Sequence, residues 1–236
     1  TWAGFKTASL GARKGKTSVP ENTLRKISDK IHKISDDFNA HKRIKKIFGE
    51  RQQSIVSGKN IDWATAESLA FATLLDEGFG VRMSGQDVGR GTFSHRHAVL
   101  YDQENESRHV PLRHFTKEQG LFEIVDSFLS EFGVLGFEYG YSQTDPKTLV
   151  IWEAQFGDFS NGAQTIIDQF ITTGERKWLR MSGLTLLLPH GHEGQGPEHT
   201  SSRLERFLQM CAEDNIQVAN CTSPANYFHI LRRQQL

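Results

Sequence analysis

Cysteine is scarce in this sequence, which has only Cys211 and Cys221 among 236 residues. Two cysteines cannot form a disulfide framework or a cysteine-rich metal site, and so low a number is typical of a reducing compartment. An excess of charge of one sign is also missing, because 28 Lys and Arg residues balance 28 Asp and Glu residues. We therefore expect neither nucleic acid nor an anionic membrane as a partner. No apolar run approaches the roughly 20 residues of a membrane span, and we expect no signal peptide.

The N-terminal quarter has the apolar spacing of a helical arm. Residues at helical intervals predict helices over residues 21–38 and 41–48, and Gly58 is expected to end this arm. Residues 1–20 are expected to be an extended lead-in, which begins with Thr1 instead of methionine, as in a segment excised from a longer chain. We therefore predict a linker and helical arm over residues 1–60 and a domain over residues 61–236.

The rest of the sequence alternates between short apolar runs and amphipathic stretches. Asp62 is expected to cap a helix that runs from Trp63 to Glu77. Strands are predicted at residues 79–83, 124–128, 148–152, 183–188 and 217–221, and further helices at residues 132–141, 161–173 and 201–211 and after Ser223. Successive strand and helix units predict an α/β fold, a parallel sheet with helices on both faces. Ligands of such sheets bind beyond the carboxyl ends of the strands, where the loops after residues 152 and 188 are expected.

Two aromatic or acidic residues near these loops are candidates for a site. Glu131 opens a segment in which glycines recur at helical spacing, at positions 133, 136 and 140, so that another backbone or a flat ligand can come close. An acid at a helix N-terminus also simply stabilises the helix dipole. Phe156 follows the strand at residues 148–152 and is either a core residue or a stacking partner for a flat ring.

A glycine-rich loop after residue 188 contains His190, His192 and His199. One interpretation of these histidines and Glu193 is the zinc site of a hydrolase, but the helical His-Glu-x-x-His spacing of such sites is missing. Loop histidines without a special role are the usual alternative. We therefore assign no metal ligand.

Four long strings are similar to one family of enzymes. They occupy residues 84–97, 130–142, 152–159 and 189–199 and read SGQDVGRGTFSHRH, SEFGVLGFEYGYS, WEAQFGDF and PHGHEGQGPEH. In these strings, and over nearly the whole chain, the sequence resembles the decarboxylating first component of the 2-oxoglutarate dehydrogenase complex, which depends on thiamine diphosphate. The resemblance implies that the chain is a fragment of a larger multidomain enzyme and has its transketolase-like pyrimidine-binding fold.

The resemblance implies that Glu131 is catalytic and that Glu131 and Phe156 bind the cofactor. Glu131 would hydrogen-bond the pyrimidine ring and favour the tautomer that takes the thiazolium proton, and Phe156 would stack on the ring. Gly157-Asp158-Phe159 is only superficially similar to the start of the motif that binds diphosphate and Mg²⁺, because phenylalanine replaces its second glycine. Mg²⁺ ligands are therefore expected in a diphosphate-binding domain outside this chain, and the fragment alone is expected to be inactive.

Histidines complete the implied site. By the pattern of the related transketolases, His190 and His199 would contact substrate and transfer protons, since histidine titrates near working pH. His95, His97 and His192 are further candidates for substrate binding. The implied reaction is the oxidative decarboxylation of 2-oxoglutarate in the tricarboxylic acid cycle, with transfer of the succinyl unit to a lipoyl group.

The resemblance also implies partners. A homodimer is expected, because the family's cofactor lies between the pyrimidine domain of one subunit and the diphosphate domain of the other. The lipoyl-bearing second component, a dihydrolipoyl succinyltransferase, the third component and a small 2-oxo acid are expected as well. The location would be the cytoplasm of a bacterium or the mitochondrial matrix of a eukaryote. Three alternatives stay open: a sister 2-oxo acid dehydrogenase or decarboxylase, for example on 2-oxoadipate, a non-catalytic dimerisation domain, and a histidine-rich metallohydrolase.

Overall fold

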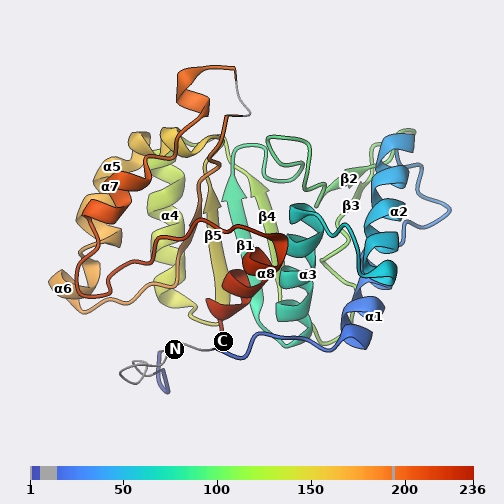
Figure 1. Cartoon of the computed structure of the whole chain (residues 1–236), viewed down its shortest axis with the longest axis horizontal. Coiled ribbons are helices and arrows are strands. Elements are labelled where there is room, and N and C mark those ends of the chain that lie inside the picture. Colours follow the sequence, from blue (N-terminus) through green and yellow to red (C-terminus); the bar gives the residue numbers. More distant parts are fainter. Residues whose placement is uncertain (1, 6–14, 193–194) are drawn as a thin grey trace. The chain divides into compact units, whose positions relative to one another are not determined.

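The computed structural model describes residues 2–5, 15–192 and 195–236 (Figure 1). Residues 6–14 of the expected lead-in and Glu193 of the histidine loop lie outside the described residues. The chain divides into two compact units. Unit 1 comprises Thr1–Ala3, Arg82–Val88 and Ile124–Asn220, and unit 2 comprises Gly4–Val81, Gly89–Glu123 and Cys221–Leu236. The domain boundary at residue 60 stays a prediction.

A parallel four-stranded sheet with helices confirms the predicted fold class. Its strands lie in the order β4 (Phe122–Asp126), β1 (Gly80–Gly85), β5 (Thr148–Glu153) and β6 (Thr185–Leu187). β5 pairs with β6 in parallel, with Trp152 opposite Leu186. The residues of β5 from Leu149 to Trp152 are at most 1% exposed. Such burial is typical of a continuous apolar strand that is covered on both faces.

In unit 1, α4 (Glu131–Thr144) packs on β5. Ser130 caps the helix, because its side-chain oxygen accepts a hydrogen bond from the N–H of Gly133 at 3.5 Å. The inner face of α4 belongs to the hydrophobic core of this unit, whose buried members are Val134, Leu135, Trp152, Ala154, Ala163, Ile166 and Ile167. The core therefore joins α4, β5 and the helical stretch that follows β5.

The stretch after β5 is helical but irregular. A 3-10 helix η1 (Gly157–Ala163), one α-turn α5 (Gln164–Ile166) and a π-helix η2 (Ile167–Ile171) stand in place of the helix predicted over residues 161–173. Ile166 and Ile167 are buried as predicted, but Phe170 is 36% exposed. In the π turn the N–H of Thr172 bonds to the carbonyl of Ile167 at 3.0 Å. This wider turn contains one more residue than an α-turn and rotates Phe170 off the core face.

Two further expectations for unit 1 need correction. The helix predicted over residues 201–211 is shorter, α7 (Leu204–Gln209), because Arg203 has a left-handed backbone with φ of 55°. Residues 217–221, predicted to form a strand, have no regular structure. Gln217 and Ala219 are exposed there and only Val218 is a bulky apolar residue, so that the segment has too little apolar surface to join a sheet. The unit also contains α6 (Gly174–Trp178) and η3 (Pro197–His199).

Unit 2 is mainly helical. It contains α1 (Glu21–Ile31), α2 (Lys42–Ser57), α3 (Trp63–Asp76) and α8 (Pro224–Arg233), with a short antiparallel pair of β2 (Leu100–Tyr101) and β3 (Arg108–His109). Figure 1 shows α8 beside α3, with which it packs. Two predicted helix signals are confirmed, since Asp62 accepts from the N–H of Thr65 at 2.7 Å and Gly58 ends α2 with φ of 67°. The predicted helix bounds need correction, because α1 ends at Ile31 and not at residue 38, and α2 runs on past residue 48 to Ser57. No helix within the described ranges is long and apolar enough to cross a membrane.

His32 is buried at the end of α1, where it is 5% exposed. Its ring meets Phe48 edge-on with 5.6 Å between centroids, and its Nδ1 lies 3.0 Å from Ser28 Oγ. Burial, assisted by the nearby charge of Arg51, lowers the pKa of His32 to about 4. His32 is therefore neutral in the folded chain at pH 7.

Acidification should destabilise the chain through His32. In the unfolded chain this residue binds a proton below its ordinary pKa of 6.5, but in the folded chain only below about 4. The free energy of unfolding therefore falls as the pH drops through this window, by roughly 2 kcal/mol between pH 7 and 5. Urea unfolding at a series of pH values measures this fall. In His32→Gln the fall between pH 7 and 5 should be smaller by that amount, and the dependence of the free energy of unfolding on pH above 7.5 should be unchanged. The same pH dependence in wild type and variant would refute the assignment.

Candidate active site

Glu131 is the first residue of α4, at the positive end of the helix dipole. Its half-buried side chain lies against Gly162 of η1, where an added Cβ would be 3.1 Å from Glu131 Oε2. Within the described part of the chain, its carboxylate has no hydrogen-bond or ion-pair partner. A carboxylate in this position is available to accept a hydrogen bond from a ligand.

Phe156 follows β5 and is stacked on His199. The ring centroids are 3.9 Å apart with an angle of 12° between the planes, and Phe159 meets both rings edge-on. The N–H of Gly196 donates to His199 Nδ1 at 3.3 Å, and His199 Nε2 lies 3.4 Å from a carboxylate oxygen of Glu198. The structure thus brings together two residues that the sequence predicts for the site, as one aromatic stack.

His190 stands on the loop after β6 and is exposed. Its Nδ1 accepts a hydrogen bond from the backbone N–H of Ser202 at 3.0 Å, and the Ser202 hydroxyl lies 3.2 Å from the same nitrogen. Ser202 itself is only 1% exposed. One side of the His190 ring is therefore anchored to a buried residue, while the ring itself is open to solvent.

An ion pair lies directly beside this anchor. Arg203 Nε donates to Asp158 Oδ1 at 3.0 Å, and Arg203 Nη2 lies 3.4 Å from Asp158 Oδ2. The hydrogen bonds to Asp158, together with its charge, raise the pKa of Arg203 above its ordinary value. Sequence reasoning missed both Ser202 and Arg203. Asp158, one of the two acids in the string at residues 152–159, was the signal in the sequence that a cationic partner lies nearby.

The remaining loop histidine, His192, is exposed and adjoins Glu193, which lies outside the described residues. Among residues 2–5, 15–192 and 195–236, no group of three or more His, Cys, Asp or Glu side chains is placed to hold a metal ion. The structure therefore offers no observation in favour of a zinc site in this loop.

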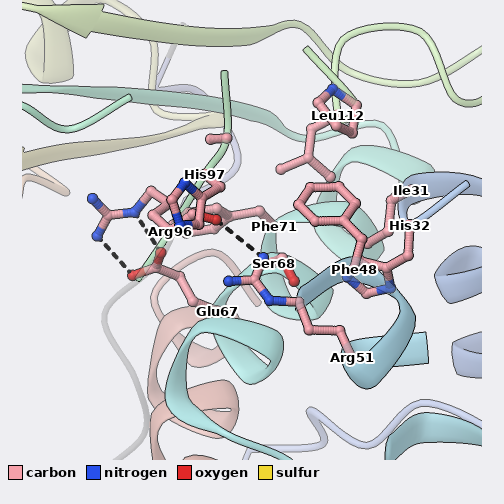
Figure 2. Close-up of a pocket in the computed structure, with 12 residues that line it drawn as sticks. Ile31, His32, Phe48, Arg51, Glu67, Ser68, Phe71, Arg96, His97 and Leu112 are labelled. Carbon is pink, nitrogen blue, oxygen red and sulfur yellow. Dashed lines mark hydrogen bonds and ion pairs between the residues drawn. The ribbon is translucent and has the colours of Figure 1, made fainter. Parts of the chain in front are cut away.

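His95 and His97 belong to unit 2 and flank a buried ion pair. Arg96 Nε donates to Glu67 Oε1 at 2.6 Å and Arg96 Nη2 to Glu67 Oε2 at 3.1 Å, and both side chains are at most 5% exposed. Figure 2 shows the two side chains pointing toward one another, with Arg51 nearby. The Tyr227 hydroxyl also donates to Glu67, at 2.7 Å. The charge of Arg96 is thus neutralised within the fold.

Burial governs the protonation of these groups. Burial and then the charge of Arg96 lower the pKa of His95 to about 4, and burial and then Arg51 lower the pKa of His97. Burial alone would raise the pKa of Glu67, but the charge of Arg96 and the hydrogen bonds from Arg96 and Tyr227 outweigh it, so that this pKa lies below its ordinary value. At pH 7 both histidines are therefore neutral and can contact an anion only through hydrogen bonds.

Comparison with known proteins identifies relatives. The family model of the transketolase pyrimidine-binding domain matches residues 59–236. The chain is 61% identical over 235 residues to the 2-oxoglutarate dehydrogenase E1 component of Brucella anthropi. The match covers 99% of this chain and 24% of the relative. The proteins of the same name from Brucella canis and Brucella suis are also 61% identical over 235 residues, with 23% of each relative covered. The chain thus spans about a quarter of the length of these curated relatives.

Loss of the Arg96 side chain should destabilise unit 2. Arg96→Met leaves the carboxylate of Glu67 buried without its partner, which is expected to lower the free energy of unfolding by about 3–5 kcal/mol. Chemical denaturation measures the loss, and Arg113→Met, at an exposed position, should stay within about 0.5 kcal/mol of wild type. The double variant Glu67→Gln/Arg96→Met should recover part of the loss. If Arg96→Met were as stable as the wild type, the ion pair of Arg96 with Glu67 would be unimportant for the stability of the fold.

Proposed function

The chain belongs to the transketolase pyrimidine-binding domain family, and from this we propose that it is the pyrimidine-binding domain of a 2-oxoglutarate dehydrogenase first component. The whole enzyme would catalyse the oxidative decarboxylation of 2-oxoglutarate and pass the succinyl unit to a lipoyl group. The observation that carries the proposal is the unpaired carboxylate of Glu131 at the start of α4. The names of the Brucella relatives support the choice of substrate.

The residues of unit 1 fit the pyrimidine ring of thiamine diphosphate. Such a ring needs a hydrogen-bond acceptor for one ring nitrogen and a flat surface against which one of its faces packs. Glu131 supplies the acceptor, and Gly162 beside it leaves the carboxylate uncovered by a side chain. Phe156, which caps the same helix η1, supplies an aromatic ring close by in the chain. These residues therefore fit the cofactor that the family implies.

Each of these residues has a chemical task in the proposal. Thiamine diphosphate, when bound, supplies the carbon nucleophile and the electron sink for decarboxylation. Glu131 holds a proton of the pyrimidine ring in a hydrogen bond at its carboxylate oxygen, which orients the ring. Phe156 covers apolar surface of the site and excludes water from it. His190 and His199 lie on the loop after β6 and contact the substrate, with His192 of the same loop as a further contact. A role of His95 and His97, which belong to unit 2, in substrate binding stays a prediction.

An apolar surface on unit 1 supports a homodimer. Phe128, Leu129, Phe132 and Phe137 are 103%, 57%, 51% and 58% exposed, and we call these four residues the α4 patch. Large apolar side chains that are exposed at neighbouring positions in the chain are typical of a protein interface. Gly140 on the same helix has nothing within 4 Å of an added Cβ, so that a second backbone has room to approach.

The other partners follow from the same proposal. Mg²⁺ would be held by residues of a diphosphate-binding domain outside these 236 residues, and the isolated chain would be inactive. The lipoyl-bearing second component, a dihydrolipoyl succinyltransferase, and the third component would complete the complex. The protein would work in the cytoplasm of a bacterium or the mitochondrial matrix of a eukaryote.

Removal of the Glu131 carboxylate tests the proposed catalytic role. In the full-length protein with thiamine diphosphate and Mg²⁺, Glu131→Ala should lower the 2-oxoglutarate-dependent reduction of an artificial electron acceptor by at least about 100-fold. Glu175→Gln, at an exposed site on α6, is the matched control and should retain the wild-type rate. A fully active Glu131→Ala variant would remove this residue from the mechanism.

Substrate comparison in the same assay tests the reaction. Wild-type turnover of 2-oxoglutarate is expected. Turnover of 2-oxoadipate in its place would keep the chemistry and overturn the substrate, and no turnover of any 2-oxo acid would overturn the proposed function.

Charge introduced into the α4 patch tests the homodimer. Phe128→Lys together with Phe132→Lys should convert the full-length dimer to monomer, because the interface would bury two unpaired ammonium groups. Sedimentation velocity distinguishes the two states. Leu208→Lys, at a site 58% exposed on α7, should remain dimeric. A dimer in both variants would place the interface elsewhere.

A further inference from the structure

The hydrogen bond from Ser202 defines the tautomer of His190. A backbone N–H can only donate, so His190 Nδ1, which receives the Ser202 N–H at 3.0 Å, must carry a lone pair and no proton. The neutral ring then has its proton on Nε2. Because His190 is exposed, this Nε2–H can reach a bound molecule.

Gly157 fixes the two chain segments that hold His190. Its N–H donates to the carbonyl of Pro189 at 3.0 Å, and Pro189 precedes His190. An added Cβ at Gly157 would lie 2.8 Å from the Cα of Ser202 and from the Pro189 carbonyl oxygen. Pro189, which precedes His190, and Ser202, which is hydrogen-bonded to the His190 ring, are therefore both packed against Gly157, a residue without a side chain.

The charges of Asp158 and Arg203 connect the segment of Gly157 to the segment of Ser202. Gly157 and Ser202 lie in close contact, and the ion pair is formed by the residue that follows each of them, Asp158 and Arg203. The Asp158 side chain is 11% exposed. Arg203 adopts a left-handed backbone with φ of 55°, which is unfavourable for an arginine and needs compensation from a specific contact. The bidentate pair with Asp158 supplies this contact.

We propose that the Asp158–Arg203 ion pair positions His190 for catalysis, by holding the Ser202 N–H on Nδ1 so that His190 acts as a hydrogen-bond donor through Nε2–H. The acceptor is the oxygen of the substrate's 2-oxo group, where negative charge develops during addition. His190 thus donates without giving up its proton, and it is not a base at Nδ1. This proposal rests on the proposed function and adds a role for two residues that do not touch the substrate.

The first test measures kinetics of the full-length enzyme with thiamine diphosphate and Mg²⁺. Arg203→Met should lower kcat on 2-oxoglutarate by on the order of 10- to 100-fold, and Arg203→Lys, which keeps the charge, should restore part of the loss. In a His190→Gln background Arg203→Met should cause no further loss, because the pair acts through His190. The matched control is Arg176→Met, which breaks an exposed ion pair with Glu213 in the same unit and should leave kcat unchanged.

A second test reads His190 without any turnover. Diethyl pyrocarbonate attacks the lone pair of a neutral imidazole, and in wild type that lone pair is engaged by Ser202. His190 should therefore react more slowly than the exposed His192 of the same loop, as followed by mass spectrometry of the peptides. Arg203→Met should raise the rate at His190 severalfold, and Arg176→Met should not.

The outcomes separate this proposal from the proposed function. An Arg203→Met variant with wild-type kcat and wild-type His190 labelling would overturn the positioning role, as would an equal loss of kcat in the His190→Gln background. A wild-type enzyme that turns over no 2-oxo acid would overturn the proposed function, and the labelling rates would still decide whether the ion pair holds the His190 ring.

Discussion

The close approach at Gly157 is the constraint on which the arrangement of unit 1 depends. The end of β5, the loop after β6 and the start of α7 converge there, with no space for a Cβ between Gly157 and Ser202. A side chain at this position would push the two loops apart and separate the anchors of His190. Polar contacts then hold the loops together, among them the hydrogen bond from Gly191 N–H to the Thr200 carbonyl at 2.9 Å and the ion pair of Arg203 with Asp158. Steric contact at Gly157 therefore sets how closely the loops approach, and the polar contacts keep them in place.

Buried charge orders the rest of each unit. In unit 1, Arg82 of β1 makes two hydrogen bonds to Glu138 of α4, at 2.8 and 2.9 Å, and Glu138 is 1% exposed. In unit 2, Arg96 and Glu67 form a comparable pair. A buried pair adds little net stability over apolar residues, but an alternative packing that separates the partners is strongly unfavourable. These pairs thus specify which helix face meets which strand or loop.

The sequence predicts the elements that depend on local chemistry. The apolar run of β5, the Asp62 cap and the Gly58 stop of α2 are read from residues close in the chain. The contacts of the candidate site are of another kind, because His190 and Ser202 are 12 residues apart and Asp158 and Arg203 are 45 apart. Arginine rarely adopts a positive φ, and the sequence therefore does not predict that Arg203 delays the start of α7 to Leu204. The family resemblance pointed to Glu131 and to His190, but not to the residues that hold His190.

The π turn of η2 decides how this part of the chain tolerates a change in length. Two residues separate Gly174 from the end of η2, and an added Cβ at Gly174 would run into the Tyr139 hydroxyl. Because a π-turn contains one more residue than an α-turn, deletion of one residue from Ile167–Ile171 would let the turn relax to α-helical geometry and would leave Gly174 in its place. Homologous sequences should therefore accept a gap of one residue within Ile167–Ile171 but keep a glycine at position 174.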